Sequence, residues 1–94
     1  MLTDIVLTQQ IARVYAKLVK EVMGSNVDEV VLVSAQAVEW SDSSLGCAQP
    51  GMLYAQVITE GYKIVLKVGN INYQFHTDAN PNGQILLCIR PNST

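Results

Sequence analysis

Basic residues are scarce in this sequence, which has six lysines and arginines against eight acidic residues and a formal net charge of −2. Proteins that bind nucleic acids gain most of their affinity by neutralising phosphates with basic side chains, so nucleic acid is not expected as a partner. The chain also lacks any apolar run near the roughly 18 residues of a membrane span. No basic segment precedes an apolar stretch at its start, as a secretory signal requires. These absences predict a cytoplasmic protein that contacts no membrane.

The length and the apolar content predict one folded domain over residues 1–94. Hydrophobic residues make up 49% of the chain and charged residues only 15%, which argues against disorder. A chain of 94 residues is too short for two domains and has a thin stability margin. The apolar excess predicts that some hydrophobic surface remains for another protein, or for a second copy of the chain in a homodimer.

The clearest periodic pattern covers residues 4–23 and predicts a helix. Its apolar residues recur every three or four positions and fall on one face: Leu7, Ile11, Val14, Tyr15, Leu18 and Val22. Thr3 or Asp4 is expected to cap the start of the helix, and Gly24 to end it.

Three basic residues of this helix, Arg13, Lys17 and Lys20, are expected on its outer side. Glu21 follows Lys17 by one turn, where it can form an ion pair with that lysine. A short basic stripe of this kind is most often a solvated face, so no acidic partner is inferred from it.

The rest of the sequence predicts a β-meander. Runs rich in β-branched and aromatic residues predict strands over residues 27–40, 53–58, 62–68, 71–76 and 85–89. Short turn sequences join consecutive strands at 59–61, 69–70 and 78–83. Alternation then places one apolar face of the antiparallel sheet toward the helix. The predicted fold class is α+β, with an N-terminal helix packed on a curled antiparallel meander of four to five strands.

The connection over residues 41–51 is long for such a fold and rich in serine, glycine and proline. Loops of this length tend to be functional or internally packed. One interpretation is a self-packed loop closed by Trp40, and the other is a rigid surface that recognises another protein. The residues predicted to contact that partner are Trp40, Asp42, Ser43, Ser44, Leu45, Gln49 and Pro50.

Residues 38–88 carry a joint pattern of short motifs. These are W-x-D-S-S-L-G-C-x-Q-P-G from Trp40, Y-x-Q-V-x-T-x-G-Y-x-I-V-L from Tyr54, Y-x-F-H-T-D from Tyr73 and the final L-C at Leu87. The pattern resembles that of a group of small bacterial domains of unknown function. Ala48 stands where that group has proline, which loosens the expected turn. The resemblance supports a single small domain and implies no catalytic residue.

Cys47 and Cys88 are the two cysteines of the chain, and they are compatible with a disulfide or with two buried free thiols. In a flat meander the intervening strands hold them roughly 14 Å apart, whereas a disulfide needs Cα atoms within about 7 Å. A bridge therefore requires a strongly curled sheet or a loop that crosses it, and a reducing cytosol argues against one. A zinc site needs more ligands than these cysteines and a single histidine supply in this layout. No metal or other cofactor is expected.

The single histidine, His76, invites a catalytic interpretation. Such a mechanism would use Ser43, Ser44 or Cys47 as the nucleophile and Asp42 or Asp78 to orient the imidazole. In the predicted meander, however, His76 lies roughly 20 Å from Ser43 and Cys47, at the opposite end of the sheet. A nucleophile must come within about 3 Å of its base. We therefore expect no catalytic residues and no enzyme, with His76 paired to Asp78 in a turn.

Three functions are compatible with these patterns. The first is a non-enzymatic protein-interaction module that acts through the 41–51 loop or a strand edge. The second is a small peptidase inhibitor, because a helix across a sheet and the segment Gln56-Val57-x-x-x-Gly61 near a hairpin are loosely similar to the cystatin arrangement. In this chain, however, the Gln-Val pair is expected within a strand. The third is a thiol- or disulfide-based sensor that uses Cys47 and Cys88.

Overall fold

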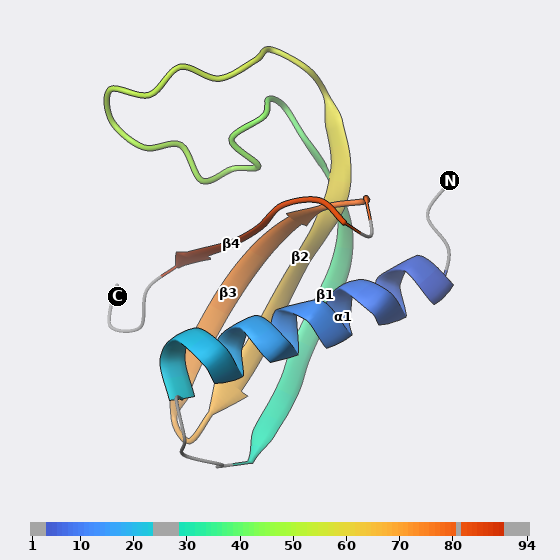
Figure 1. The fold of residues 1–94 in the computed structure, drawn as a ribbon, viewed down its shortest axis with the longest axis vertical. Coiled ribbons are helices and arrows are strands. Elements are labelled where there is room, and N and C mark those ends of the chain that lie inside the picture. The colour runs from blue at the N-terminus through green and yellow to red at the C-terminus, as the bar shows by residue number, and fades with distance from the viewer. Residues whose placement is uncertain (1–3, 24–28, 81, 90–94) are drawn as a thin grey trace.

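The computed structural model of the chain describes residues 4–23, 29–80 and 82–89. Its elements are helix α1 (Asp4–Leu18), which continues into the π-helical turn η1 (Val19–Met23), and strands β1 (Val30–Trp40), β2 (Thr59–Val68), β3 (Ile71–Asp78) and β4 (Ile85–Ile89). The strands form one open antiparallel sheet in the order β1-β2-β3-β4, and α1 lies across one face of it (Figure 1). The predicted α+β class is confirmed, with four strands. No helix among the described residues has the length and apolar character needed to cross a membrane.

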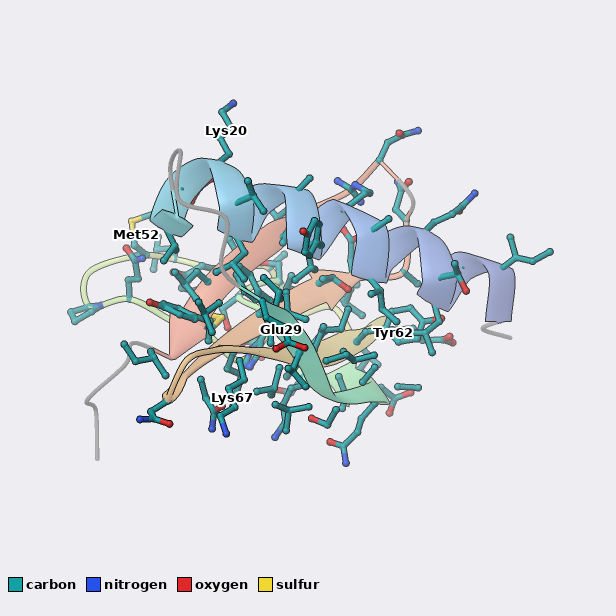
Figure 2. The ribbon with its side chains drawn as sticks, turned by 90° about the horizontal axis from the view of Figure 1, so that it is seen from below. Lys20, Glu29, Met52, Tyr62 and Lys67 are labelled. Carbon is teal, nitrogen blue, oxygen red and sulfur yellow. A yellow bond between two sulfur atoms is a disulfide. The ribbon has the colours of Figure 1, made fainter. Side chains whose placement is uncertain are left out.

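The hydrophobic core lies between α1 and the sheet. Alternation along β2 and β3 turns every second side chain toward the helix, and the buried cluster consists of Val14, Leu18, Tyr62, Ile64, Leu66 and Phe75. Lys67, one residue after Leu66, points away from α1 on the other side of the sheet (Figure 2). Burial of this apolar surface is the main force that holds the helix against the sheet.

The buried line of α1 differs in part from the predicted stripe. Val14 and Leu18 are fully buried, but Tyr15 and Val22 are exposed. Gln10 occupies the position one turn before Val14 and is fully buried, because residues four apart lie on one line of a helix. The predicted apolar face was therefore too wide, because it included Tyr15 and Val22. The buried face of α1 also contains the polar residue Gln10.

Gln10 and Arg13 join α1 to the β3–β4 connection. The Gln10 side-chain amide donates to the carbonyl oxygens of Asp78 at 3.1 Å and Asn80 at 2.8 Å. The Arg13 guanidinium donates to Gln10 Oε1 at 2.9 Å and to the Gly83 carbonyl oxygen at 2.7 Å. These bonds satisfy turn carbonyls that the packed helix partly shields from water. The prediction that Arg13 belongs to a solvated basic stripe was therefore wrong.

The outer residues of the helical segment agree with the sequence. Lys17 Nζ lies 2.6 Å from Glu21 Oε2 in the expected ion pair, and Lys20 points away from the sheet (Figure 2). The capping residues expected from the sequence, Thr3, Gly24 and the side chain of Asp4, lie outside the described residues, as do residues 27 and 28 of the first predicted strand.

The predicted strand over residues 53–58 does not form. These residues belong to an irregular connection from β1 to β2, which we call the 41–58 loop, and the predicted turn at 59–61 is the start of β2. The β-branched composition of the segment favours a strand, but a strand also needs a partner. In the folded chain β2 takes that place beside β1.

Because one predicted strand is missing, each later strand runs in the direction opposite to the predicted one. The end of the sheet at which each of these strands begins or ends is therefore exchanged. Because β1 pairs directly with β2, Trp40 lies opposite Thr59, and Gly61 of the same strand lies opposite Asp78. The ends of β1 and β3 therefore share one pole of the sheet with the loop. His76, two residues before the end of β3, lies at that pole. The prediction that His76 and the loop occupy opposite ends was wrong.

Candidate functional site

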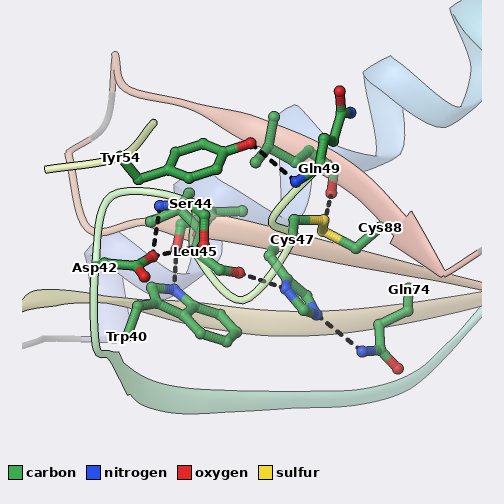
Figure 3. Close-up of a disulfide and its surroundings, with 12 residues drawn as sticks. Trp40, Asp42, Ser44, Leu45, Cys47, Gln49, Tyr54, Gln74 and Cys88 are labelled. Carbon is green, nitrogen blue, oxygen red and sulfur yellow. Dashed lines mark hydrogen bonds between the residues drawn. A yellow bond between two sulfur atoms is a disulfide. The ribbon is translucent and has the colours of Figure 1, made fainter. Parts of the chain in front are cut away.

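The 41–58 loop folds against the face of the sheet that α1 leaves open. His76 alternates along β3 with Phe75, which packs in the core beneath α1, so the imidazole points to the opposite face. Trp40 stacks on this imidazole with ring centroids 4.5 Å apart and ring planes inclined by 21°. From the loop, the Leu45 carbonyl oxygen accepts a hydrogen bond from His76 Nδ1 at 2.6 Å (Figure 3). The imidazole is buried as a result.

Gly61 allows Trp40 to reach across β2. Trp40 Nε1–H donates to the Thr77 carbonyl oxygen at 2.9 Å, which links β1 to β3. A Cβ atom at Gly61 would collide with that oxygen and lie 2.8 Å from the indole nitrogen. Gly46 is constrained in a similar way, because a Cβ atom there would lie 2.8 Å from the Trp40 ring. Both positions require glycine for the stack to form.

A tight turn shapes the first half of the loop. Asp42 Oδ1 accepts hydrogen bonds from the Ser44 hydroxyl at 2.6 Å and from the Ser44 backbone N–H at 2.9 Å, and these bonds lower the pKa of the Asp42 carboxyl. Leu45 and Gly46 follow with positive φ angles of 56° and 73°. A left-handed conformation is uncommon for leucine, and here it directs the Leu45 carbonyl toward His76.

The contacts of His76 match one neutral tautomer of the imidazole. A carbonyl oxygen can only accept, so Nδ1 carries the proton donated to Leu45, and Nε2 accepts from the Gln74 amide at 2.8 Å. Burial lowers the pKa of His76, the bond to Leu45 raises it, and the positive charge of Lys63 lowers it further. The lowered pKa favours the neutral imidazole. The predicted contact with Asp78 was wrong, since that carboxylate accepts from backbone N–H groups of the following turn.

Cys47 and Cys88 form a disulfide that ties the loop to β4, with Cα atoms 5.6 Å apart. Of the two alternatives that the sequence leaves open, the structure contains the bridge, and the loop makes the approach by crossing the sheet. One ring nitrogen of His76 and the two sulfur atoms all lie within 4.8 Å of one another. Three groups that the sequence appeared to separate are thus gathered at one point.

The second half of the loop is braced against the first. Ser43 N–H donates to the Ala55 carbonyl oxygen at 2.9 Å, and Ala55 N–H donates to the Ser43 hydroxyl at 2.8 Å. The Tyr54 hydroxyl accepts from the Gln49 N–H at 3.1 Å (Figure 3). Together with the disulfide and the aromatic stack, these bonds give the loop a fixed base.

Apolar side chains project from this braced loop. We call four of them the loop tip, and their exposed fractions are 58% for Met52, 96% for Leu53, 57% for Val57 and 66% for Ile58. No charged residue occurs between Asp42 and Glu60. The tip was missed in the sequence because its composition favours a strand, and the Pro-Gly pair at 50–51 is the one local signal of an irregular path.

The residues predicted to contact a partner fall into two groups. The buried or hydrogen-bonded group, which forms the framework of the loop, comprises Trp40, Asp42, Ser43, Ser44 and Leu45. The exposed group comprises Gln49 and Pro50. The predicted set therefore combines residues of the loop framework with two exposed residues.

The structure brings the candidate catalytic groups closer together than expected, but does not pair them. The Ser44 hydroxyl donates to Asp42, and both ring nitrogens of His76 are engaged by other groups. Cys47 is held in the disulfide. Among the described residues, the candidate reactive atoms that do lie together are the two sulfurs and one ring nitrogen of His76. These are atoms that can take part in thiol–disulfide chemistry.

Residues 11–88 match the family described as "Domain of unknown function (DUF8738)". The chain belongs to this family. The matched region of the DUF8738 domain runs from within α1 to Cys88, so it contains the 41–58 loop, the Trp40–His76 stack and both cysteines. No curated protein and no solved structure matches the chain.

Proposed function

We propose that this DUF8738 domain is a non-enzymatic module that binds another protein through the tip of the 41–58 loop. The proposal rests on Leu53, which is 96% exposed on a loop whose base is fixed by a disulfide, an aromatic stack and hydrogen bonds. A preorganised loop loses little conformational entropy on binding. Exposed apolar patches often mark interaction sites, and residues 52–58 expose four large apolar side chains.

The chemistry of the tip favours an apolar groove on the partner. The segment from 43 to 59 carries no charge, so binding leaves no ionised group of the loop without a counter-ion. Full burial of one leucine or isoleucine side chain contributes about 1.5–3 kcal/mol. Leu53 and Ile58, the two most exposed tip residues, are therefore the proposed anchors for a partner.

The contacts of the polar groups support a role without catalysis. His76 uses Nδ1 to hold the Leu45 carbonyl, and the Ser44 hydroxyl holds the carboxylate of Asp42. In this proposal both groups are structural parts of the loop. Their function is to position the tip.

The free edge of β1 is the other candidate surface. Val31, Leu32 and Val33 are exposed there, and among the described strands β1 pairs only with β2. However, the register shifts between Leu32 and Ser34, and an irregularity of this kind disfavours the addition of another strand. The loop tip is therefore the better supported surface.

Tip and edge variants distinguish these two surfaces. Leu53→Ser combined with Ile58→Ser removes two tip side chains, and Val31→Ser combined with Val33→Ser is the matched control on the β1 edge. The wild-type chain is first used to capture a protein partner. We expect the tip variant to keep the wild-type free energy of unfolding and to bind that partner at least tenfold more weakly than the wild type does. The edge variant should bind like the wild type. Normal binding by the tip variant would refute the proposal, and a loss confined to the edge variant would transfer the function to β1.

A peptidase inhibitor is a second candidate, and the path of the loop favours it. Gln56 and Val57 lie in the exposed loop, where the sequence predicts a strand. Leu53 stands on a braced loop of the kind that enters a peptidase cleft at low entropic cost. Its uncharged side chain suits an apolar specificity pocket such as that of chymotrypsin. Inhibition of chymotrypsin but not trypsin, with the reverse for Leu53→Lys, would support this function. Cleavage of the loop without inhibition would exclude it.

A further inference from the structure

A second site lies where the disulfide joins the loop to β4. We propose that Cys47, Cys88 and His76 bind a zinc ion when the disulfide is reduced. This inference goes beyond the proposed function and does not depend on it, because no tip residue contributes a ligand. The disulfide and the metal are then alternative clamps that hold the same loop to β4.

The three ligand atoms already lie close together. Both sulfurs and one ring nitrogen of His76 are within 4.8 Å of one another. The ligands of a tetrahedral zinc ion, at about 2.0 Å for nitrogen and 2.3 Å for sulfur, are roughly 3.5–4 Å apart. Once the S–S bond is broken, the sulfurs can separate, and the proposed site then requires His76 to present Nε2 to them. Thiolate and imidazole are also donors that suit zinc.

The hydrogen bonds of His76 prepare the imidazole for a metal. Histidines that bind metals commonly donate their second ring N–H to a backbone carbonyl, which fixes the tautomer and the ring orientation. His76 makes this bond to Leu45 through Nδ1. The remaining lone pair, on Nε2, accepts from the side-chain amide of Gln74. A metal ion replaces a single side-chain donor at that nitrogen, and the Leu45 contact is retained.

The two cysteines lie near the surface of the protein. Cys47 and Cys88 are partly exposed, and shallow hollows flank Cys47 on two sides. One hollow is lined by Tyr54 among others, and the other by Lys17 and Glu21. Water can therefore supply the fourth ligand, as it does in zinc sites that have three protein ligands.

Replacement of the disulfide by a zinc ion requires a dithiol reductant. Its two thiols supply two electrons and two protons, the Cys47–Cys88 S–S bond breaks, two cysteine thiols form, and the reductant becomes a disulfide. Zinc binding then releases the two thiol protons to water. In a reducing compartment, such as the cytoplasm expected from the sequence, the metal keeps the loop in place where a disulfide does not persist.

Cobalt(II) absorption tests the site, because cobalt reports both thiolate ligation and tetrahedral geometry. The full chain is reduced, freed of reductant without oxygen and titrated with Co²⁺, with the disulfide form as the matched control. We expect a thiolate charge-transfer band and visible d–d bands that saturate at one ion per chain and disappear when one equivalent of Zn²⁺ is added. Absence of these bands in the folded reduced chain, or saturation at one ion per two chains, overturns the proposal.

Substitutions test whether the imidazole is a ligand. We expect His76→Gln to bind Zn²⁺ at least tenfold more weakly in competition with a chromophoric chelator. Gln74→Ala is the control, because it removes only the bond to Nε2, and it should bind Zn²⁺ as tightly as the wild type or more tightly. Equal affinities of His76→Gln and the wild type would overturn the assignment of histidine as a ligand.

A measurement on the unaltered chain guards against unfolding of the His76 variant. His76 is the single histidine, so its nitrogen-15 resonances are unambiguous. We expect Zn²⁺ to shift the Nε2 resonance of the reduced chain, while Nδ1 stays protonated and bonded to Leu45. An unchanged Nε2 resonance at saturating Zn²⁺ overturns the proposal.

Discussion

The indole of Trp40 and the imidazole of His76 stack with their centroids 4.5 Å apart, and so join the last residue of β1 to the end of β3 across β2. The contact forms because Gly61, on the strand between them, has no side chain. The Leu45 carbonyl then covers the imidazole from the loop. Loop and sheet are therefore one packed unit, and each of these contacts should contribute to the stability of the chain.

Replacement of Gly61 by alanine should separate Trp40 from β3. The added Cβ collides with the Thr77 carbonyl oxygen, which is backbone and cannot rotate away. We expect Gly61→Ala to lower the free energy of unfolding in urea by about 3 kcal/mol. Gly69→Ala is the control, because Gly69 has a φ of +62° but nothing lies within 4 Å of its Cβ position, so the expected loss is about 1 kcal/mol. Equal losses would contradict the role assigned to Gly61.

Removal of the disulfide should destabilise the chain while the sheet persists. The bridge closes a loop with a sequence separation of 41 residues. Cys47→Ala combined with Cys88→Ala can form neither the bridge nor a metal site, and should lower the free energy of unfolding by about 2–4 kcal/mol. The far-ultraviolet circular dichroism should stay β-rich, since the core beneath α1 contains neither cysteine. An unchanged urea midpoint would show that the other contacts hold the loop without the bridge.

The stability of the oxidised chain should increase with pH in the range where His76 titrates. Burial lowers the pKa of His76 in the folded chain below the ordinary value of 6.5, so as the pH falls the unfolded chain takes up the proton first. Stability is then complete above the unfolded pKa and declines as the pH falls from there toward the folded pKa. Urea unfolding at about pH 7.5 and pH 5 measures this slope across the histidine range. His76→Gln should flatten the slope, and a slope of opposite sign would refute a neutral buried imidazole.

The contact between helix and turn should matter more than the ion pair on the helix surface. Gln10→Ala removes the donor to the carbonyls of Asp78 and Asn80 and should cost about 1–3 kcal/mol of unfolding free energy. Lys17→Ala is the control, since it removes the surface pair with Glu21 and should cost about 0.5 kcal/mol or less. If the two losses were the same, Gln10 would not be the link that joins α1 to the sheet.

The elements that depend on neighbouring residues could be predicted from the sequence. The helix follows from spacings of three and four residues, and the β2–β3 turn from Gly69-Asn70. The Lys17–Glu21 pair depends only on helical geometry. These features need no information from distant parts of the chain.

The site could not be predicted in the same way, because contacts distant in sequence decide it. Whether residues 53–58 form a strand depends on which segment pairs with β1, and the answer, β2, is set by the register of the whole sheet. Because residues 53–58 were predicted to form an extra strand, His76 was placed at the wrong end of the sheet. This placement separated the imidazole from Cys47 and hid the cluster with Cys88. The burial of Leu45 likewise depends on His76, which lies 31 residues further along the chain.

Photo-cross-linking from the loop tip tests the central claim most directly. Benzoylphenylalanine replaces Leu53 in one variant and Gln36, an exposed residue of β1, in the control. Both variants should unfold at the wild-type urea midpoint, so that any difference reports contact with a partner. We predict that the probe at position 53 forms a covalent adduct with one protein partner and that the probe at position 36 does not. Adducts from position 36 with none from position 53 would contradict the account.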